Sequence, residues 1–381
     1  QLAQMGSIFF GKALTLEALT GIDMRTIMVV SGICIIIYTM LGGMEAVIWT
    51  EVAQGIIKTI GAGVVLWIVV MEMENGFGDI ITIGTTDDKF SLGSFSLTDF
   101  TTSTFWVVFL YGFFINLNNF GIDQNYVQRY HTAKNAKEAA RSIWLCVYWY
   151  LPVSLVFFFI GTSLYAYFQQ HPELIESVKQ QVAMEKGIAM SALTAADYGD
   201  KVLPHFMVTK VPHGLLGLII AAILSAAMST ISSGMNSSAT VFLKDIYQRY
   251  IDKDVSPKKE LVVLYVSTAT MGVLAIATGI VMIGVKSILD LWWQLAGIFA
   301  GGMLGLFLMG MISKSAGNAT AKLATAIGIL VIIWMTFSVL LPEEYAGLRN
   351  PLHMNMVIVV GTLAIFLSGV LISKFIKQKA S

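Results

Sequence analysis

Long apolar runs separated by short polar connections make up most of the chain. Ten of them approach the ~20 residues needed to cross a hydrocarbon core, at 1–19, 25–43, 46–72, 103–127, 143–167, 214–247, 261–284, 288–312, 319–341 and 352–374. The first is the weakest because Lys12 and Glu17 interrupt it. The pattern predicts an all-α polytopic membrane protein with about ten transmembrane segments.

Composition agrees with this class. The chain is 56% hydrophobic and only 13% charged, whereas soluble domains carry about 25% charged residues. Its formal net charge is zero, so no global field favours nucleic acid. Lys and Arg gather in alternate connections (124–142, 244–260, 313–322 and the C-terminal tail). We expect these on the cytoplasmic side of a cell membrane, plasma or inner, crossed several times. Soluble-enzyme motifs are missing from the sequence, so we expect no enzyme.

The segment at 103–127 becomes polar where a membrane helix should stay apolar. Its apolar part ends after about ten residues, and Asn116, Asn118, Asn119 and Asp123 follow. A lipid-facing helix cannot carry these groups, because each unpaired polar group in hydrocarbon costs several kcal/mol. Two alternatives remain: an early helix end with a polar loop, or a discontinuous helix that lines a substrate path.

The segment at 214–247 is about 50 Å long as a helix, so one end should protrude from the membrane. Ser229, Ser232, Ser233 and Ser237 are three and four residues apart and share a face. Such a cluster of oxygens suits a hard cation. The alternative is that the hydroxyls bond carbonyls of the preceding turn or pack against another helix. The spacing leaves both open.

Glu51 places a carboxylate near the start of the apolar segment 46–72. Ionisable residues in such segments usually face the bundle interior and often mark ion paths. The alternative is an interfacial position in contact with water. Gln54 and Lys58 follow three and seven residues later, on the same helix face.

Three stretches resemble core helices of the sodium–solute symporters, and they occur in the family's order. "YTMLGGMEAVIWTE" is similar to the junction of the fourth and fifth core helices, "NLNNFGIDQNYVQRY" to the broken sixth, and "AAILSAAMSTISSGMNSSATVFLKDIY" to the eighth. The resemblance covers nearly the whole chain. The stretch "KSAGNAT" departs from the family pattern, because it lacks the usual Gly-Ala pair.

The resemblance implies one transmembrane transporter domain over 1–381, with a LeuT-type fold of two inverted five-helix repeats. Residues 1–72 would end the first repeat, 103–312 would form the second, and 313–381 would add two C-terminal helices. The first core helices would be missing. In the family, the first of them supplies backbone ligands to sodium, so we do not expect the chain to transport by itself.

The resemblance also implies where sodium binds. The carbonyl of Ala226 and the hydroxyls of Ser229 and Thr230 would form the eighth-helix half of the common sodium site. Some members have a second site, whose ligands here would be Ser229, Ser232, Ser233 and Glu51. Glu51 departs from the family pattern, in which Asp is usual, and an apolar residue is usual where this chain has Lys58.

The function implied is secondary active symport of a small polar solute. A neutral sugar or polyol is favoured, with sialic acid or an amino acid as the alternative. The candidate substrate-binding residues are Asn116, Asn119, Phe120, Tyr150, Trp293 and Gln294. Ser7 takes the position of a third-helix Arg that pairs with the substrate carboxylate in the sialic acid branch, which argues against an acidic substrate.

Individual substrate positions carry different weight. Asn116 matches a sugar-contacting Asn of the sodium/galactose branch, whereas Asn119 and Phe120 stand where two aromatic residues are typical. Tyr150 replaces a Lys that contacts sugar there. Trp293 and Gln294 could stack on and hydrogen-bond a sugar ring, and their alternative role is packing.

Two other classes of function stay open. The same fold can carry signalling domains, so a membrane sensor is one rival. A passive channel is another, and it would show sodium-independent flux that does not saturate.

Overall fold

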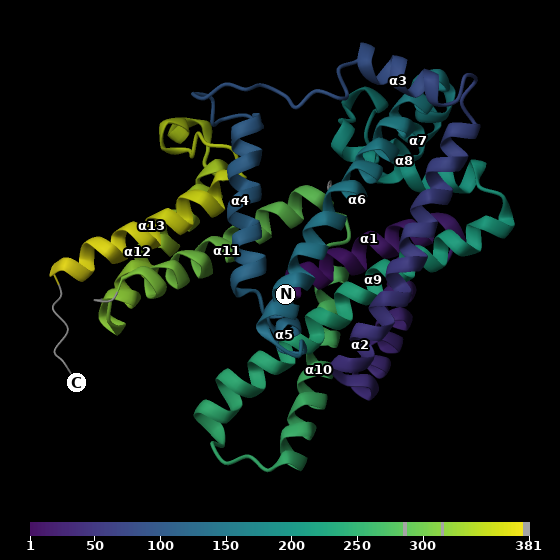
Figure 1. The fold of residues 1–381 in the computed structure, drawn as a ribbon. Coiled ribbons are helices and arrows are strands. Elements are labelled where there is room, and N and C mark those ends of the chain that lie inside the picture. The colour runs from purple at the N-terminus through teal and green to yellow at the C-terminus, as the bar shows by residue number, and fades with distance from the viewer. Residues whose placement is uncertain (285–287, 314–315, 376–381) are drawn as a thin grey trace. The chain divides into compact units, whose positions relative to one another are not determined.

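The computed structural model describes residues 1–284, 288–313 and 316–375, with the backbone but not the side chains at 42–46, 213, 288–296, 299 and 340. The described chain is helical nearly throughout. Its helices form two compact units (Figure 1): Gln1–Ser91 with Thr132–Ile288, and Leu92–His131 with Leu289–Ser381. This division follows packing within each unit, and the repeat boundaries expected from the sequence remain a prediction.

The first unit is built around α2 and α9, which share the most extensive helix contact in the described chain. The helix α10 packs on α1, α2 and α9, so that these four form one bundle. A π-helical segment, η2, continues α9 directly. The elements of this unit are α1 (Leu2–Thr20), α2 (Met24–Met71), α3 (Phe77–Thr86), α6 (Ala136–Gln170), α7 (Pro172–Lys186), η1 (Met190–Ala192), α8 (Ala195–Lys210), α9 (His213–Val241), η2 (Phe242–Ile251) and α10 (Pro257–Val281).

The second unit centres on the pair α12 and α13, which pack closely along their lengths. Glycine makes this possible, because a Cβ at Gly328 would lie only 2.0 Å from a side-chain carbon of Ile365. The helix α4 packs on α13. The elements of this unit are α4 (Phe105–Ile122), α5 (Gln124–Tyr130), α11 (Ile288–Ile312), α12 (Asn318–Phe337), η3 (Ser338–Leu340), η4 (Glu343–Leu348) and α13 (Met356–Phe375).

The hydrophobic pattern is confirmed as a set of membrane-spanning helices. Within the described residues, eight stretches are long and apolar enough to cross a membrane, and Met24–Leu41 and Val47–Met71 are two of them within α2. The segment predicted at 1–19 is helical as α1, but Lys12 and Glu17 lower its hydropathy and it is not among the eight. In α11 the apolar part with described side chains is the shorter stretch Ala300–Ile312.

The polar segment at 103–127 is one helix with a break near its end. The helix α4 continues through the asparagines to Ile122, so it does not stop after ten residues. Asp123 then leaves helical geometry, with ψ of 125°, and its side chain caps α5 by accepting a hydrogen bond from the Asn125 backbone. The discontinuity is therefore at Asp123, later than the polarity pattern suggests. Asparagine is tolerated inside α4 partly because Asn116 Nδ2 donates to the Gly112 carbonyl at 2.7 Å.

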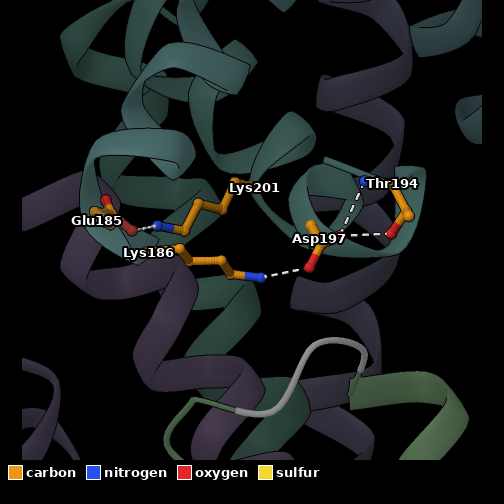
Figure 2. Close-up of polar contacts among 5 residues, drawn as sticks. All are labelled: Glu185, Lys186, Thr194, Asp197 and Lys201. Atoms are coloured by element: carbon orange, nitrogen blue, oxygen red, sulfur yellow. Dashed lines mark hydrogen bonds and ion pairs between the residues drawn. The ribbon is translucent and has the colours of Figure 1, made fainter. Parts of the chain in front are cut away.

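The connection between α6 and α9 folds into a helical hairpin, α7 and α8, outside the candidate spans. Figure 2 shows how two lysines reach across it. Asp197 caps the start of α8 by accepting hydrogen bonds from the Thr194 backbone (2.9 Å) and hydroxyl (2.5 Å), and it pairs with Lys186 at 2.8 Å. Its side chain is only 3% exposed. The second pair, Glu185 with Lys201, is more exposed.

We predict that Gly61→Ala destabilises the α2–α9 pair. A Cβ at Gly61 would lie 2.4 Å from the Cβ of Ala222, so one helix must shift. Such overpacking costs about 1–3 kcal/mol, which exceeds the gain of up to about 1 kcal/mol in helix propensity. The matched control is Gly63→Ala on the same helix, where a Cβ would meet nothing within 4 Å. Thermal unfolding of the natural full-length protein in detergent should separate them, and equal melting temperatures would contradict the close contact.

We also predict that Asp197 makes the hairpin sensitive to acid. The Lys186 ammonium and then Thr194 hold the pKa of the Asp197 carboxyl well below its ordinary value of 3.8. The stabilisation is therefore fully present above that ordinary value and is lost as the pH falls through the lower folded pKa. Asp197→Asn should increase hydrogen exchange of residues 172–210 at pH 7, and the difference should shrink in acid. Lys201→Met removes the exposed pair and should change exchange little; an equal effect of both variants would contradict the assignment.

Candidate functional site

Two long helices, α2 and α9, bring the predicted ion-binding residues together. Three contacts define how they run: Glu51 meets Ser233, Lys58 meets Ser229, and Gly61 lies against Ala222. Increasing numbers on α2 face decreasing numbers on α9, so the helices are antiparallel. The polar face of each helix is directed at the other, and the site lies wholly within the first unit.

Glu51 is the carboxylate of this site. The Ser233 hydroxyl donates a hydrogen bond to Glu51 Oε1 across the helix pair. Ser233 is buried and Glu51 is half-buried. Glu51 is thus directed at the α9 hydroxyls, as expected of an ionisable residue that faces the bundle interior. The Glu51 side chain is one methylene longer than the Asp of the family pattern, and its carboxylate accepts a hydrogen bond from Ser233.

Gln54 and Tyr38 extend the polar patch around Glu51. The Tyr38 hydroxyl donates to the Met228 carbonyl at 3.2 Å and lies near the side chains of Ser232 and Gln54. Gln54 is 8% exposed, and its Oε1 atom accepts no hydrogen bond from any described part of the chain. A buried amide oxygen without a donor is costly, and a hard cation is a ligand that would satisfy it.

The other hydroxyls of the α9 ladder turn back to their own helix. Ser232 Oγ donates to the Ser229 carbonyl at 3.2 Å, and Ser237 Oγ donates to the Gly234 carbonyl at 3.1 Å. Both side chains are fully buried. The serine spacing left open whether these hydroxyls bind a cation or bond carbonyls of the preceding turn, and these bonds are of the second kind. A hydroxyl that donates in this way keeps its oxygen lone pairs for a cation, so the bonds do not exclude ligation.

The three residues expected at the common sodium site also lie together. Ser229 Oγ and Thr230 Oγ1 both donate to the Ala226 carbonyl, at 3.0 Å and 3.4 Å. Ser229 additionally accepts a hydrogen bond from Lys58 Nζ at 3.1 Å. The long Lys58 side chain thus contacts α9 three residues closer to Ser233 than Ala226 is.

The candidate substrate residues are spread over both units. Asn116, Asn119 and Phe120 share one face of α4 by their spacing, and Asn116 is exposed. The Phe120 ring packs on Tyr126 of α5, with centroids 5.0 Å apart. Tyr150 belongs to α6 of the first unit and is 65% exposed. The side chains of Trp293 and Gln294 lie outside the described residues, so their assignment remains a prediction.

The sequence analysis gave no site role to two polar residues. Tyr38 is one, because nothing in its local sequence indicates that its hydroxyl reaches α9. Asn118 is the other: it is 3% exposed, and its Oδ1 has no hydrogen-bond partner among the described residues. Its position on the opposite side of α4 from Asn116 and Asn119 could have been inferred from helical spacing.

Comparison with known proteins places this arrangement in a family. A family model, the sodium:solute symporter family, matches residues 2–331. The sodium/sialic acid symporter SiaT of Proteus mirabilis is 31% identical over 334 residues, covering 87% of this chain and 64% of that protein. The sodium/sialic acid symporter NanT of Aliivibrio fischeri is 30% identical over 346 residues, covering 90% and 64%.

More distant relatives and a solved structure agree. The sodium-dependent multivitamin transporter of Oryctolagus cuniculus is 28% identical over 348 residues, covering 90% of this chain and 51% of that protein. A solved structure of a Na⁺-coupled sialic acid symporter, substrate-bound and outward-open, matches with a TM-score of 0.81 and 27% identity, covering 100% of this chain and 73% of that chain. The chain spans about two thirds or less of the length of these curated relatives.

The apolar helices and the family match thus define a multi-pass membrane protein. The chain belongs to the sodium:solute symporter family, as its sequence motifs suggested.

We predict that Ser229→Ala weakens sodium activation more than Ser237→Ala. Ser229 is expected to serve both sodium positions, whereas Ser237 lies two turns further along α9 and donates its hydroxyl to the Gly234 carbonyl. Loss of one ligand to a charged group should cost about 1.5–3 kcal/mol, roughly ten- to a hundredfold in apparent affinity. Sodium titrations of uptake by the natural full-length protein would measure this. Small and equal effects would assign both serines to helix packing.

Proposed function

We propose that the natural protein is a sodium-coupled secondary active symporter that imports a small polar solute. The carrying observation is the carboxylate of Glu51 directed at the α9 hydroxyls, beside an amide oxygen of Gln54 that has no donor among the residues the structure describes. The family match supports sodium as the coupling ion. Family membership also favours a transporter over a sensor, and a transporter requires no covalent chemistry.

Sodium would bind where these oxygens converge. Glu51, Ser229, Ser232 and Ser233 are the proposed ligands of one sodium, and Ala226, Ser229 and Thr230 are the proposed α9 ligands of the common position. The donor set suits a hard cation, since every ligand is an oxygen. Sodium bound there would hold α9 against its neighbours and raise the affinity for the solute, and the solute must raise the affinity for sodium by the same factor.

For the solute, we infer an acidic sugar of the sialic acid class. The two sialic acid symporters and the solved sialic acid symporter that resemble this chain support this alternative better than a neutral sugar. Ser7 points the other way, since it offers no positive charge. It is buried, its hydroxyl donates to the Ala3 carbonyl at 2.9 Å, and it contacts Met282. An anionic solute would therefore need a different donor for its carboxylate.

Uptake by the natural full-length protein in vesicles tests both parts of the proposal. We expect saturable uptake of labelled sialic acid that requires a sodium gradient and is weakened strongly by Asn116→Ala. Equilibrium sodium binding without solute should stay nearly intact in that variant, because Asn116 is not one of the proposed ion ligands.

Other outcomes would redirect the proposal. Sodium-dependent uptake of a neutral sugar or polyol, without sialic acid uptake, would restore the solute favoured from the sequence. Flux that neither saturates nor needs sodium would indicate a channel and overturn symport. Parallel loss of sodium binding and uptake in Asn116→Ala would give Asn116 a structural role in α4.

A further inference from the structure

Lys58 is a cation placed among the proposed ligands of another cation. Its ammonium donates to Ser229 Oγ at 3.1 Å, and Ser229 is only 7% exposed. Ser229 is the residue expected to serve both sodium positions. The family resemblance assigns no role to a lysine at this position, so its contact with Ser229 requires its own explanation.

We propose that the Lys58 ammonium takes the place of one sodium at Ser229. The position formed by Ala226, Ser229 and Thr230 then holds a cation tethered to α2, and sodium binds beside Glu51. This inference rests on the proposed sodium symport, because it concerns which cation these oxygens bind.

The charges between the two helices favour this division. Among residues with described side chains, α2 and α9 carry a single carboxylate, Glu51. Lys58 and one sodium together already exceed its negative charge by one. Lys58 contacts Ser229, and the sodium beside Glu51 would lie at Ser233. These two serines are four residues apart on α9, a rise of about 6 Å. A second sodium at Ser229 would add another positive charge within that distance, at a half-buried site where repulsion is poorly screened.

The hydrogen bonds also distinguish the oxygens near Ser229 from those near Glu51. At Ser229, the hydroxyl proton goes to the Ala226 carbonyl while Lys58 uses an oxygen lone pair. Beside Glu51, in contrast, the Gln54 Oε1 atom has no donor in the described chain. The oxygen that lacks a partner among the described residues thus lies on the Glu51 side, whereas the Ser229 oxygen already accepts a hydrogen bond from Lys58.

Equilibrium binding of radioactive sodium to the purified natural full-length protein, without solute, tests the inference. We expect Lys58→Met to bind one more sodium per protein, or to bind sodium on the order of tenfold more tightly, because a nearby like charge is removed. Lys58→Arg keeps the charge and should stay close to the wild type. The matched control is Lys12→Met: Lys12 is another lysine of this unit that bonds a serine, Ser31, at 2.6 Å, and it is buried, whereas Lys58 is half-buried. It should leave sodium binding unchanged.

The outcomes separate this inference from the proposed function. If the wild type binds sodium and Lys58→Met binds it with the same stoichiometry and affinity, the role of Lys58 is overturned. The proposed symport is not affected by that result. Absence of sodium binding in both proteins would overturn symport and, with it, this inference. Should Lys58→Met not fold, Lys58→Gln replaces it, since glutamine removes the charge but keeps a hydrogen-bond donor for Ser229. The same increase in sodium binding is then expected, and its absence would count equally against the proposal.

Discussion

The contact between Glu51 and Ser233 is the constraint on which the α2–α9 pair depends. A carboxylate that faces the contact between two apolar helices costs free energy, unless an opposite charge or hydrogen bonds compensate for its lost hydration. Ser233 supplies one bond directly, and the neighbouring polar side chains of Ser232, Gln54 and Tyr38 gather on the same side. These groups fix which faces of the two helices meet. Rotating either helix would carry the polar groups toward lipid, where they have no partners.

Close packing and polar contact act together along this pair. Gly61 allows α9 to approach at Ala222, and the polar contacts lie further along toward Ser233. The small residues determine the distance between the helices, and the carboxylate and lysine determine their register. The proposed ion site would inherit its geometry from this helix packing, so serines with bonds to their own helix are compatible with it. Their hydroxyl oxygens are held in place before any ion binds.

The sequence was sufficient for the helices and their class, but less so for the contacts between them. Hydrophobic runs located the membrane-spanning helices, because the length and polarity of each segment are local properties. The break near α5 was displaced from its predicted place, since asparagine inside α4 can bond the preceding turn, as Asn116 does with Gly112. Serine spacing left ion ligation and packing undecided, and the contacts across the helix pair, above all that of Glu51 with Ser233, favour ligation. Tyr38 was missed for the same reason: its partner, the Met228 carbonyl, is 190 residues away along the chain.

Two departures from the family pattern have one structural consequence in common. Glu51 is longer than the usual Asp, and Lys58 is longer and charged where an apolar residue is usual; both reach across from α2 to a serine of α9. The helices are thus tied by their own side chains at two points one turn apart on α9. An ion can stabilise the packed helices only by the difference between its binding free energies for the packed and the separated arrangement. Where the chain already supplies part of that attraction, sodium has less to contribute to joining α2 and α9. In the proposed symport, sodium would then be coupled to the solute through the remaining face of α9, where Ala226 is exposed and Thr230 is half-buried.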